Sequence, residues 1–70
     1  MQQTTLIANI RAEMARNGKT QTDLAQLLGI TRQSVSQRML GRVDFRVSEV
    51  QAIATSLNVT VADLIGEAAA

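Results

Sequence analysis

Start and stop signals for short helices constrain this chain more than any other feature. A threonine followed three residues later by an aspartate occurs at Thr20 and Asp23, and again at Thr60 and Asp63. This spacing is the capping-box pattern that opens an α-helix. A glycine can end a helix in the left-handed conformation. Three glycines are placed to do so: Gly18, Gly29 and Gly41. The chain is therefore expected to fold as short helices joined by tight turns.

Apolar residues recur at helical spacing between these signals. The spacing predicts five helices. The first covers about 5–17, the second runs from Thr20 to the stop at Gly29, and the third runs from the Thr31 cap to about Leu40. The fourth covers about 47–57, and a short fifth helix is opened by Thr60. Two residues, Arg46 and Ser48, are candidate N-caps for the fourth helix. The residues predicted to face the core are Ile7, Ile10, Met14, Leu24, Ala25, Leu28, Ile30, Val35, Met39, Val50, Ile53, Ala54, Leu57, Val61, Leu64 and Ile65.

The expected fold is a compact all-α domain of five short helices without strands. Residues 1–70 are predicted to form this single domain, with a frayed tail at 67–70. No run of apolar residues approaches the roughly 20 that a membrane-spanning helix needs, and no signal sequence opens the chain.

Composition argues against several classes of function. The chain has 70 residues with no cysteine and no histidine, so disulfides and the commonest zinc sites are excluded. Such a chain has little room to bury a pocket and few groups for acid–base chemistry. We therefore predict a cytoplasmic binding module, not an enzyme, with no cofactor, no metal site, no catalytic residue and no small-molecule ligand.

Charge is distributed unevenly along the chain. Residues 32–46 carry four arginines against Asp44, whereas residues 47–70 carry three acidic residues and no lysine or arginine. A basic centre beside an acidic end gives one positive face, which attracts a polyanion. The alternative is an ordinary solvated surface with uneven charges.

The segment TQTDLAQLLGITRQSVSQRMLG, residues 20–41, is the most informative part of the chain. Two helices meet there at a tight turn built on Gly29, Ile30 and Thr31. Ala25 is small where the two helices must approach closely, and Val35 can contact the same core. With one helix before it and two after, this pattern is typical of a helix-turn-helix unit.

On these residues, on Gly41 and on IATSLNVTVADLI near the end, the chain resembles the lambda-repressor-like family of phage repressors, Cro proteins and small bacterial regulators. The resemblance covers about residues 5–66. It implies a five-helix domain whose third helix enters the major groove of DNA. By position in the motif, four side chains resemble the family's base-contacting set: Arg32, Gln33, Ser36 and Gln37.

Other polar residues are candidates for contacts with phosphates. Gln21 resembles the family's phosphate-clamping glutamine at the start of the second helix. Further candidates are Lys19, Ser34, Arg42 and Arg46. Arg11 and Arg16 are equally well explained as phosphate contacts or as solvated surface.

The chain departs from the family pattern at Met14, Met39 and Arg38. Met14 and Met39 stand where the family commonly has a paired arginine and glutamate. We hypothesise that the two methionines touch and hold the third helix on the first. The alternative is that they are two unrelated core methionines. Arg38 replaces an apolar residue. Its methylenes are expected to pack while its guanidinium reaches out, either to a phosphate or to an acidic residue of the same domain.

The sequence thus predicts a sequence-specific, double-stranded DNA-binding regulator, most simply a phage or mobile-element repressor. A module of this size is expected to act as two copies on a two-fold symmetric operator, or as the DNA-binding part of a longer repressor. Candidate dimer contacts are Val43, Phe45 and the segment 61–70, with core filling as the preferred role for Phe45. The alternative function is a protein-interaction module, such as an antitoxin or anti-repressor partner, that reuses the fold.

Overall fold

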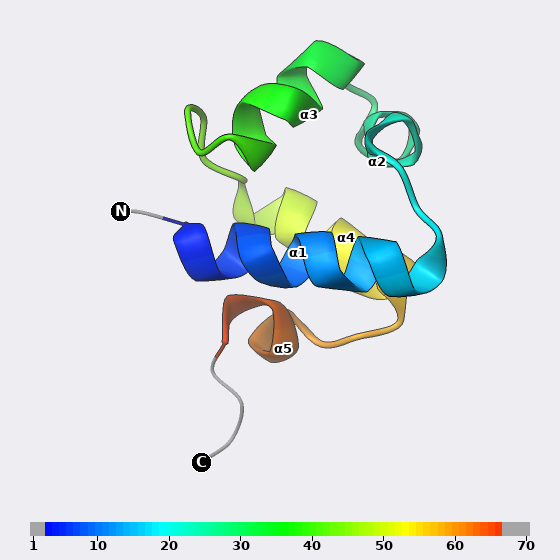
Figure 1. Ribbon diagram of the computed structural model, residues 1–70, viewed down its shortest axis with the longest axis vertical. Helices are drawn as coiled ribbons and strands as arrows, with labels where there is room; N and C mark the ends of the chain where they lie inside the picture. The colour runs from blue at the N-terminus through cyan, green and yellow to red at the C-terminus, as the bar shows by residue number, and fades with distance from the viewer. Residues whose placement is uncertain (1–2, 67–70) are drawn as a thin grey trace.

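The computed structural model describes residues 3–66, which form a domain of five α-helices and no strand within that range (Figure 1). The predicted fraying of 67–70 lies outside the described residues. The helices are α1 (Thr4–Asn17), α2 (Gln21–Leu28), α3 (Arg32–Met39), α4 (Val47–Leu57) and α5 (Val61–Ile65). Each predicted helix is therefore present, with ends within one or two residues of those expected. None of these helices has both the length and the apolarity needed to cross a membrane.

The helix α1 runs across the middle of the molecule and separates two parts of the fold. In Figure 1, α2 and α3 lie on one side of α1 and α5 lies on the other. Packing joins α1 to both α4 and α5, and joins α2 to α4, whereas the main helical neighbour of α3 is α2. The helix α3 therefore stands at one end of the molecule.

Local hydrogen bonds confirm the predicted helix starts. The Asp23 carboxylate accepts a hydrogen bond from the Thr20 N–H at 2.8 Å, while the Thr20 hydroxyl accepts one from the Asp23 N–H at 3.3 Å. Thr60 and Asp63 repeat this capping box at the start of α5, with both bonds at 3.0 Å. The cap of α4 is Arg46 and not Ser48. Because these bonds satisfy amide groups that a helix end leaves free, they define where each helix begins.

The stop signals act as predicted. Gly18 and Gly29 have φ values of +64° and +67°, in the left-handed region, and the N–H of Ile30 closes α2 by donating to the Ala25 carbonyl at 3.1 Å. A residue with a Cβ atom would be strained at these angles. The sharp turn between α2 and α3 therefore depends on Gly29.

The core is aliphatic apart from one ring. Its buried residues are Leu6, Ile10, Met14, Leu24, Ala25, Val35, Met39, Phe45, Val50, Ile53, Ala54, Leu57 and Leu64. Phe45 is 5% exposed, so its preferred role in the core is confirmed. The ring fills space that the short aliphatic side chains of this chain leave open.

Other core predictions need correction. Ile65 was expected to face inward but is 39% exposed, because Leu64 already fills the core position of this short helix and the next residue lies about 100° around it. Four other residues predicted to face the core pack against it but are only half-buried: Ile7, Leu28, Ile30 and Val61. On α1, Leu6 takes a buried position that was not predicted. A spacing of four residues from Leu6 to Ile10 fits a helix face as well as the predicted spacing of three.

Two amide side chains connect distant parts of the chain, and neither was predicted. The Gln3 side chain accepts a hydrogen bond from the Phe45 N–H at 2.7 Å and donates to the Phe45 carbonyl at 3.2 Å. The Asn9 amide donates to the Leu64 carbonyl at 2.9 Å. These bonds attach α1 to the loop before α4 and to the end of α5, where backbone groups would otherwise lack partners.

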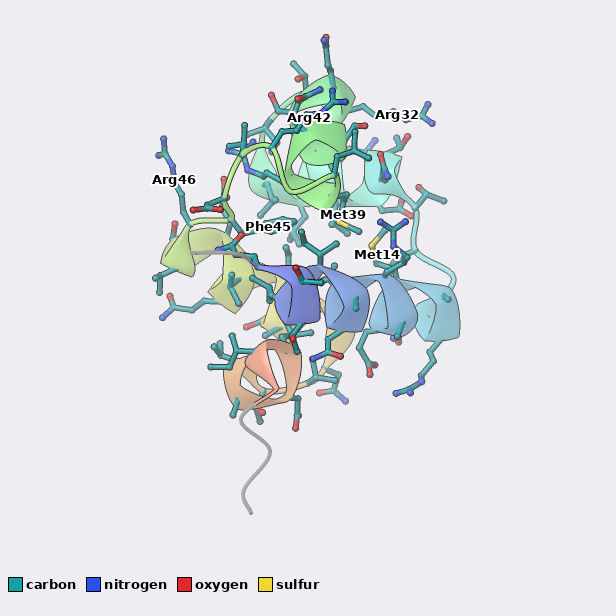
Figure 2. The ribbon with its side chains drawn as sticks, turned by 60° about the vertical axis from the view of Figure 1, so that its left-hand side comes forward. Met14, Arg32, Met39, Arg42, Phe45 and Arg46 are labelled. Carbon is teal, nitrogen blue, oxygen red and sulfur yellow. The ribbon has the colours of Figure 1, made fainter. Side chains whose placement is uncertain are left out.

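Met14 and Met39 are both buried in the core cluster, at 7% and 4% exposure. Figure 2 shows Met14 on the side of α1 that faces α3, with Met39 on the side of α3 that faces α1. This placement supports the proposal that the two side chains touch and seat α3 on α1.

The proposed methionine pair predicts a coupled response to substitution. Met14→Arg alone should lower the stability of the fold by about 3–5 kcal/mol, because it buries a charge without a partner. Adding Met39→Glu should recover most of that loss. Thermal and denaturant unfolding of the single and double variants measures the coupling, and losses that simply add would show that the two methionines do not interact.

The capping boxes predict a loss of stability in acid. Hydrogen bonds from the backbone and then the hydroxyl of Thr20 lower the pKa of Asp23 below its usual range, and Thr60 does the same for the pKa of Asp63. A carboxylate with a lowered folded-state pKa stabilises the fold above its unfolded pKa of about 4, and that contribution is lost as the pH falls through the folded value.

Asp23→Asn should therefore have a lower Tm than the wild type at pH 7, and the gap should narrow by pH 2–3. Thermal melts followed by circular dichroism across this range provide the measurement. Asp44→Asn, in an exposed loop, is the matched control and should change Tm little. An equal gap between Asp23→Asn and wild type at both ends of the pH range would contradict the assignment.

Candidate nucleic-acid interface

The helix α3 buries one narrow face and presents the rest of its surface outward. Val35 and Met39, four residues apart, are its buried residues. The Thr31 hydroxyl caps the helix by accepting a hydrogen bond from the Ser34 N–H at 3.0 Å. At about 100° per residue, the buried pair leaves the polar residues on the remaining faces.

The four predicted base-contacting residues all lie on α3, and they differ in exposure. Arg32 and Gln33, in the first turn, are exposed, whereas Ser36 and Gln37 are half-buried. The helix therefore offers hydrogen-bond donors and acceptors at two depths, fully exposed in its first turn and half-buried along its middle. This arrangement can form hydrogen bonds with groups lying in a groove alongside the helix.

Basic side chains gather at the same end of the molecule. In Figure 2, Arg32, Arg42 and Arg46 lie on the α3 side of α1, and α5 lies on the opposite side. Within residues 3–66 the ion pairs are Arg16 with Glu13 and Arg38 with Glu49. Five exposed cationic side chains thus have no ion-pair partner in the described range: Arg11, Lys19, Arg32, Arg42 and Arg46.

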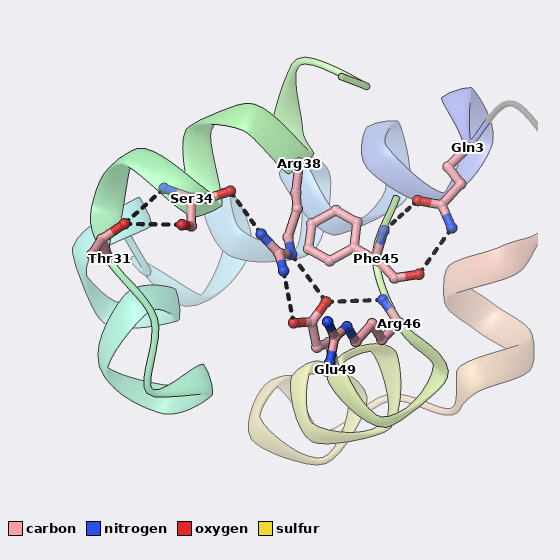
Figure 3. A network of polar contacts seen from close by, with 7 residues as sticks. All are labelled: Gln3, Thr31, Ser34, Arg38, Phe45, Arg46 and Glu49. Atoms are coloured by element: carbon pink, nitrogen blue, oxygen red, sulfur yellow. Dashed lines mark hydrogen bonds and ion pairs between the residues drawn. The ribbon is translucent and has the colours of Figure 1, made fainter. Parts of the chain in front are cut away.

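Arg38 corrects a prediction. Its guanidinium does not reach out to solvent, because the side chain is only 11% exposed and pairs with Glu49 of α4. Nε donates to Glu49 Oε1 at 3.0 Å, Nη2 donates to Oε2 at 3.2 Å, and Nη1 donates to the Ser34 carbonyl at 3.2 Å (Figure 3). The sequence left two possible partners for Arg38, a phosphate or an acidic residue of the same domain. The observed partner is the acidic residue, Glu49.

Glu49 is the functional neighbour that sequence reasoning missed. Besides Arg38, its Oε1 accepts a hydrogen bond from the Arg46 N–H at 2.9 Å. Burial alone would raise the pKa of Glu49, but the hydrogen bonds from Arg38 and Arg46 and their charges together hold this pKa below its usual range. An acidic residue three positions after the cap is a local signal that could have identified half of this contact.

The remaining predicted phosphate contacts have mixed surroundings. Ser34 is half-buried, and its Oγ accepts a hydrogen bond from the Thr31 hydroxyl at 3.0 Å. Gln21 is the first residue of α2 and is half-buried. Arg11 donates to the Met39 carbonyl at the end of α3 at 3.4 Å, and Arg16 pairs with Glu13 at 2.6 Å on the exposed surface of α1.

No group of three or more histidine, cysteine, aspartate or glutamate side chains within the described range could hold a metal ion. The exposed Arg32 and Gln33 of α3 offer positive charge and hydrogen-bonding groups. Both suit a ligand with a regular array of anions beside bases that donate and accept hydrogen bonds.

Comparison with known proteins agrees with this geometry. Residues 10–64 match the family model described as helix-turn-helix, of the lambda-repressor-like kind, so the match covers the whole of α2 to α4 and most of α1 and α5. No curated protein and no solved structure matched the chain. The chain belongs to the lambda-repressor-like family of DNA-binding helix-turn-helix regulators.

Proposed function

We propose that the protein is a sequence-specific, double-stranded DNA-binding transcription regulator of the phage or mobile-element repressor type. In this proposal α3 enters the major groove, and Arg32, Gln33, Ser36 and Gln37 contact base edges. The observation that carries it is the face of α3, which turns these polar side chains outward while Val35 and Met39 hold the helix on the core.

The chemistry of these residues suits base recognition. An arginine can donate two parallel hydrogen bonds to guanine O6 and N7, and a glutamine can bond adenine N6 and N7. Each such pair is worth roughly 1–3 kcal/mol of discrimination against the wrong base. The exposed Arg32 and Gln33 can extend furthest from the helix, while the half-buried Ser36 and Gln37 require the helix axis to approach the bases closely.

Phosphate contacts position the protein without reading sequence. The unpaired cations Lys19, Arg42 and Arg46 fit this role, with Gln21 and Ser34 as neutral donors. Arg38 does not, because Glu49 already neutralises its charge. A role for Arg38 as a phosphate contact is therefore no longer proposed.

The alternative, a protein-interaction module such as an antitoxin partner, calls for a different surface. A protein–protein interface concentrates exposed aromatic and large apolar residues at its centre. The outward face of α3 instead carries an arginine, two glutamines and a serine. This composition favours the DNA-binding proposal.

We further propose that two copies bind a two-fold symmetric operator, because one small module offers a limited interface. Phe45 is 5% exposed, so its ring offers little area to a second copy. Val43 is 44% exposed, and Ile65 lines an apolar groove of about 410 Å³ together with Val47 and Val61. Either surface offers apolar area to a second copy.

Selection of bound duplexes from a random pool tests the proposal directly. The wild type should enrich a consensus with two-fold symmetry. Titration with salt should weaken binding with a log–log slope of roughly −4 to −5 for each bound copy, since five exposed cations have no ion-pair partner. A slope near zero would contradict electrostatic docking. A pool that remains random after several rounds would contradict sequence-specific binding.

The proposed division of roles predicts different outcomes for two substitutions. Gln33→Ala should relax the preference at one or two base positions, with a loss of roughly 1–3 kcal/mol on the selected duplex only. Arg42→Ala should weaken binding to selected and random duplexes about equally and make the salt slope about one unit shallower. Fluorescence anisotropy on both duplexes measures these changes. The assignment is wrong if Arg42→Ala alters base preference and Gln33→Ala does not.

A further inference from the structure

The position of α3 depends on few connections to the rest of the fold. Its main helical neighbour is α2, and its buried side chains, Val35 and Met39, insert into the core beneath it. Apolar contacts of this kind attract without strong directional preference. Hydrogen bonds with defined geometry are therefore needed to fix the direction in which α3 points relative to α4.

The ion pair between Arg38 and Glu49 supplies this geometry. Each of the three guanidinium nitrogens donates one hydrogen bond, two to the carboxylate of Glu49 and one to the Ser34 carbonyl one turn earlier in α3. A guanidinium that bonds both oxygens of a carboxylate is held in a defined plane. The side chains are 11% and 12% exposed, so water screens the pair only weakly.

Glu49 also connects this pair to the start of α4. The oxygen that accepts from Arg38 Nε also accepts from the Arg46 N–H (Figure 3). One carboxylate therefore relates the helix that carries Gln33 and Gln37 to the backbone that carries the exposed side chain of Arg46.

We infer that Arg38 and Glu49 are positioning residues for sequence discrimination: their pair sets the direction of α3 relative to Arg46, so that base-reading and phosphate-binding side chains meet one duplex together. The inference rests on the proposed function. Hydrogen bonds to bases require placement within about 0.5 Å, whereas attraction to phosphates varies gently with distance. Loss of the pair should therefore reduce discrimination and leave non-specific binding intact.

The double variant Arg38→Met with Glu49→Gln isolates this role. It removes one positive and one negative charge, so the net charge is unchanged, and the glutamine can still accept the hydrogen bond from the Arg46 N–H at the start of α4. The matched control is Arg16→Met with Glu13→Gln, which makes the same two changes in the exposed ion pair on α1. Circular dichroism establishes that each variant is folded.

Affinity is measured on the duplex that the wild type selects and on a random duplex, over a range of salt. For Arg38→Met with Glu49→Gln, the ratio of the two affinities should fall roughly tenfold, the scale of one lost base contact. Affinity for the random duplex should stay within about twofold of wild type. The log–log salt slope should stay within about half a unit of the wild-type slope. The control variant should retain the wild-type ratio.

Arg38→Lys is the second test and decides the matter if the double variant does not fold. Lysine keeps the charge but cannot bond both carboxylate oxygens in one plane, so the ratio should fall several-fold with unchanged binding to the random duplex.

Three outcomes would overturn the inference. The first is that the folded double variant, Arg38→Met with Glu49→Gln, keeps the wild-type ratio of affinities for the selected and random duplexes. If the double variant does not fold, the same result for Arg38→Lys counts instead. Either result removes the positioning role alone. A parallel loss on both duplexes with a shallower salt slope makes Arg38 a phosphate contact instead. If the wild type itself selects no sequence, the proposed function fails, and the inference fails with it.

Discussion

The seating of α3 on two buried side chains is the constraint on which the functional surface depends. Val35 and Met39 are almost fully buried, and their spacing of four residues places them on one narrow face of the helix. Since a helix of eight residues has too few internal hydrogen bonds to be stable alone, burial of these two residues stabilises α3 and decides which of its faces points inward. The polar residues face outward because the apolar ones face inward.

The ends of the helices are set locally, and the relation between the helices is set by a few distant contacts. Capping boxes at Thr20 and Thr60 open α2 and α5, and Gly29 turns the chain sharply into α3. Gln3 acts over a longer distance, holding the backbone at Phe45, and Glu49 joins the local cap at Arg46 to Arg38 of α3. The end of the loop that leads into α4 is therefore held twice. Gln3, at the start of α1, holds it at Phe45, and Glu49, which is itself paired with Arg38 of α3, holds it at Arg46.

Charge is used in two different ways in this small domain. Arg38 is paired within the fold and contributes to its internal geometry, whereas Arg32, Arg42 and Arg46 lie exposed on the α3 side of the molecule (Figure 2). A buried and paired charge adds little to the field outside the protein, while exposed unpaired charges create it. The count of arginines in the 32–46 segment therefore overstates the charge available to a polyanion, and the environment of each arginine decides its role.

The sequence by itself determined the five helices, the threonine caps of three of them and the outward position of Arg32 and Gln33. Caps, stops and apolar spacing act within about four residues along the chain. Tertiary structure decided the rest. Whether Ile7 or Leu6 faced the core depended on how α1 lies against α4 and α5, and the exposure of Ile65 depended on what Leu64 already filled. The partners of Arg38 and Gln3 lie 11 and 42 residues away, across loops whose path no local preference defines. Contacts of that separation exist only once the helices have packed, so only the tertiary structure could reveal them.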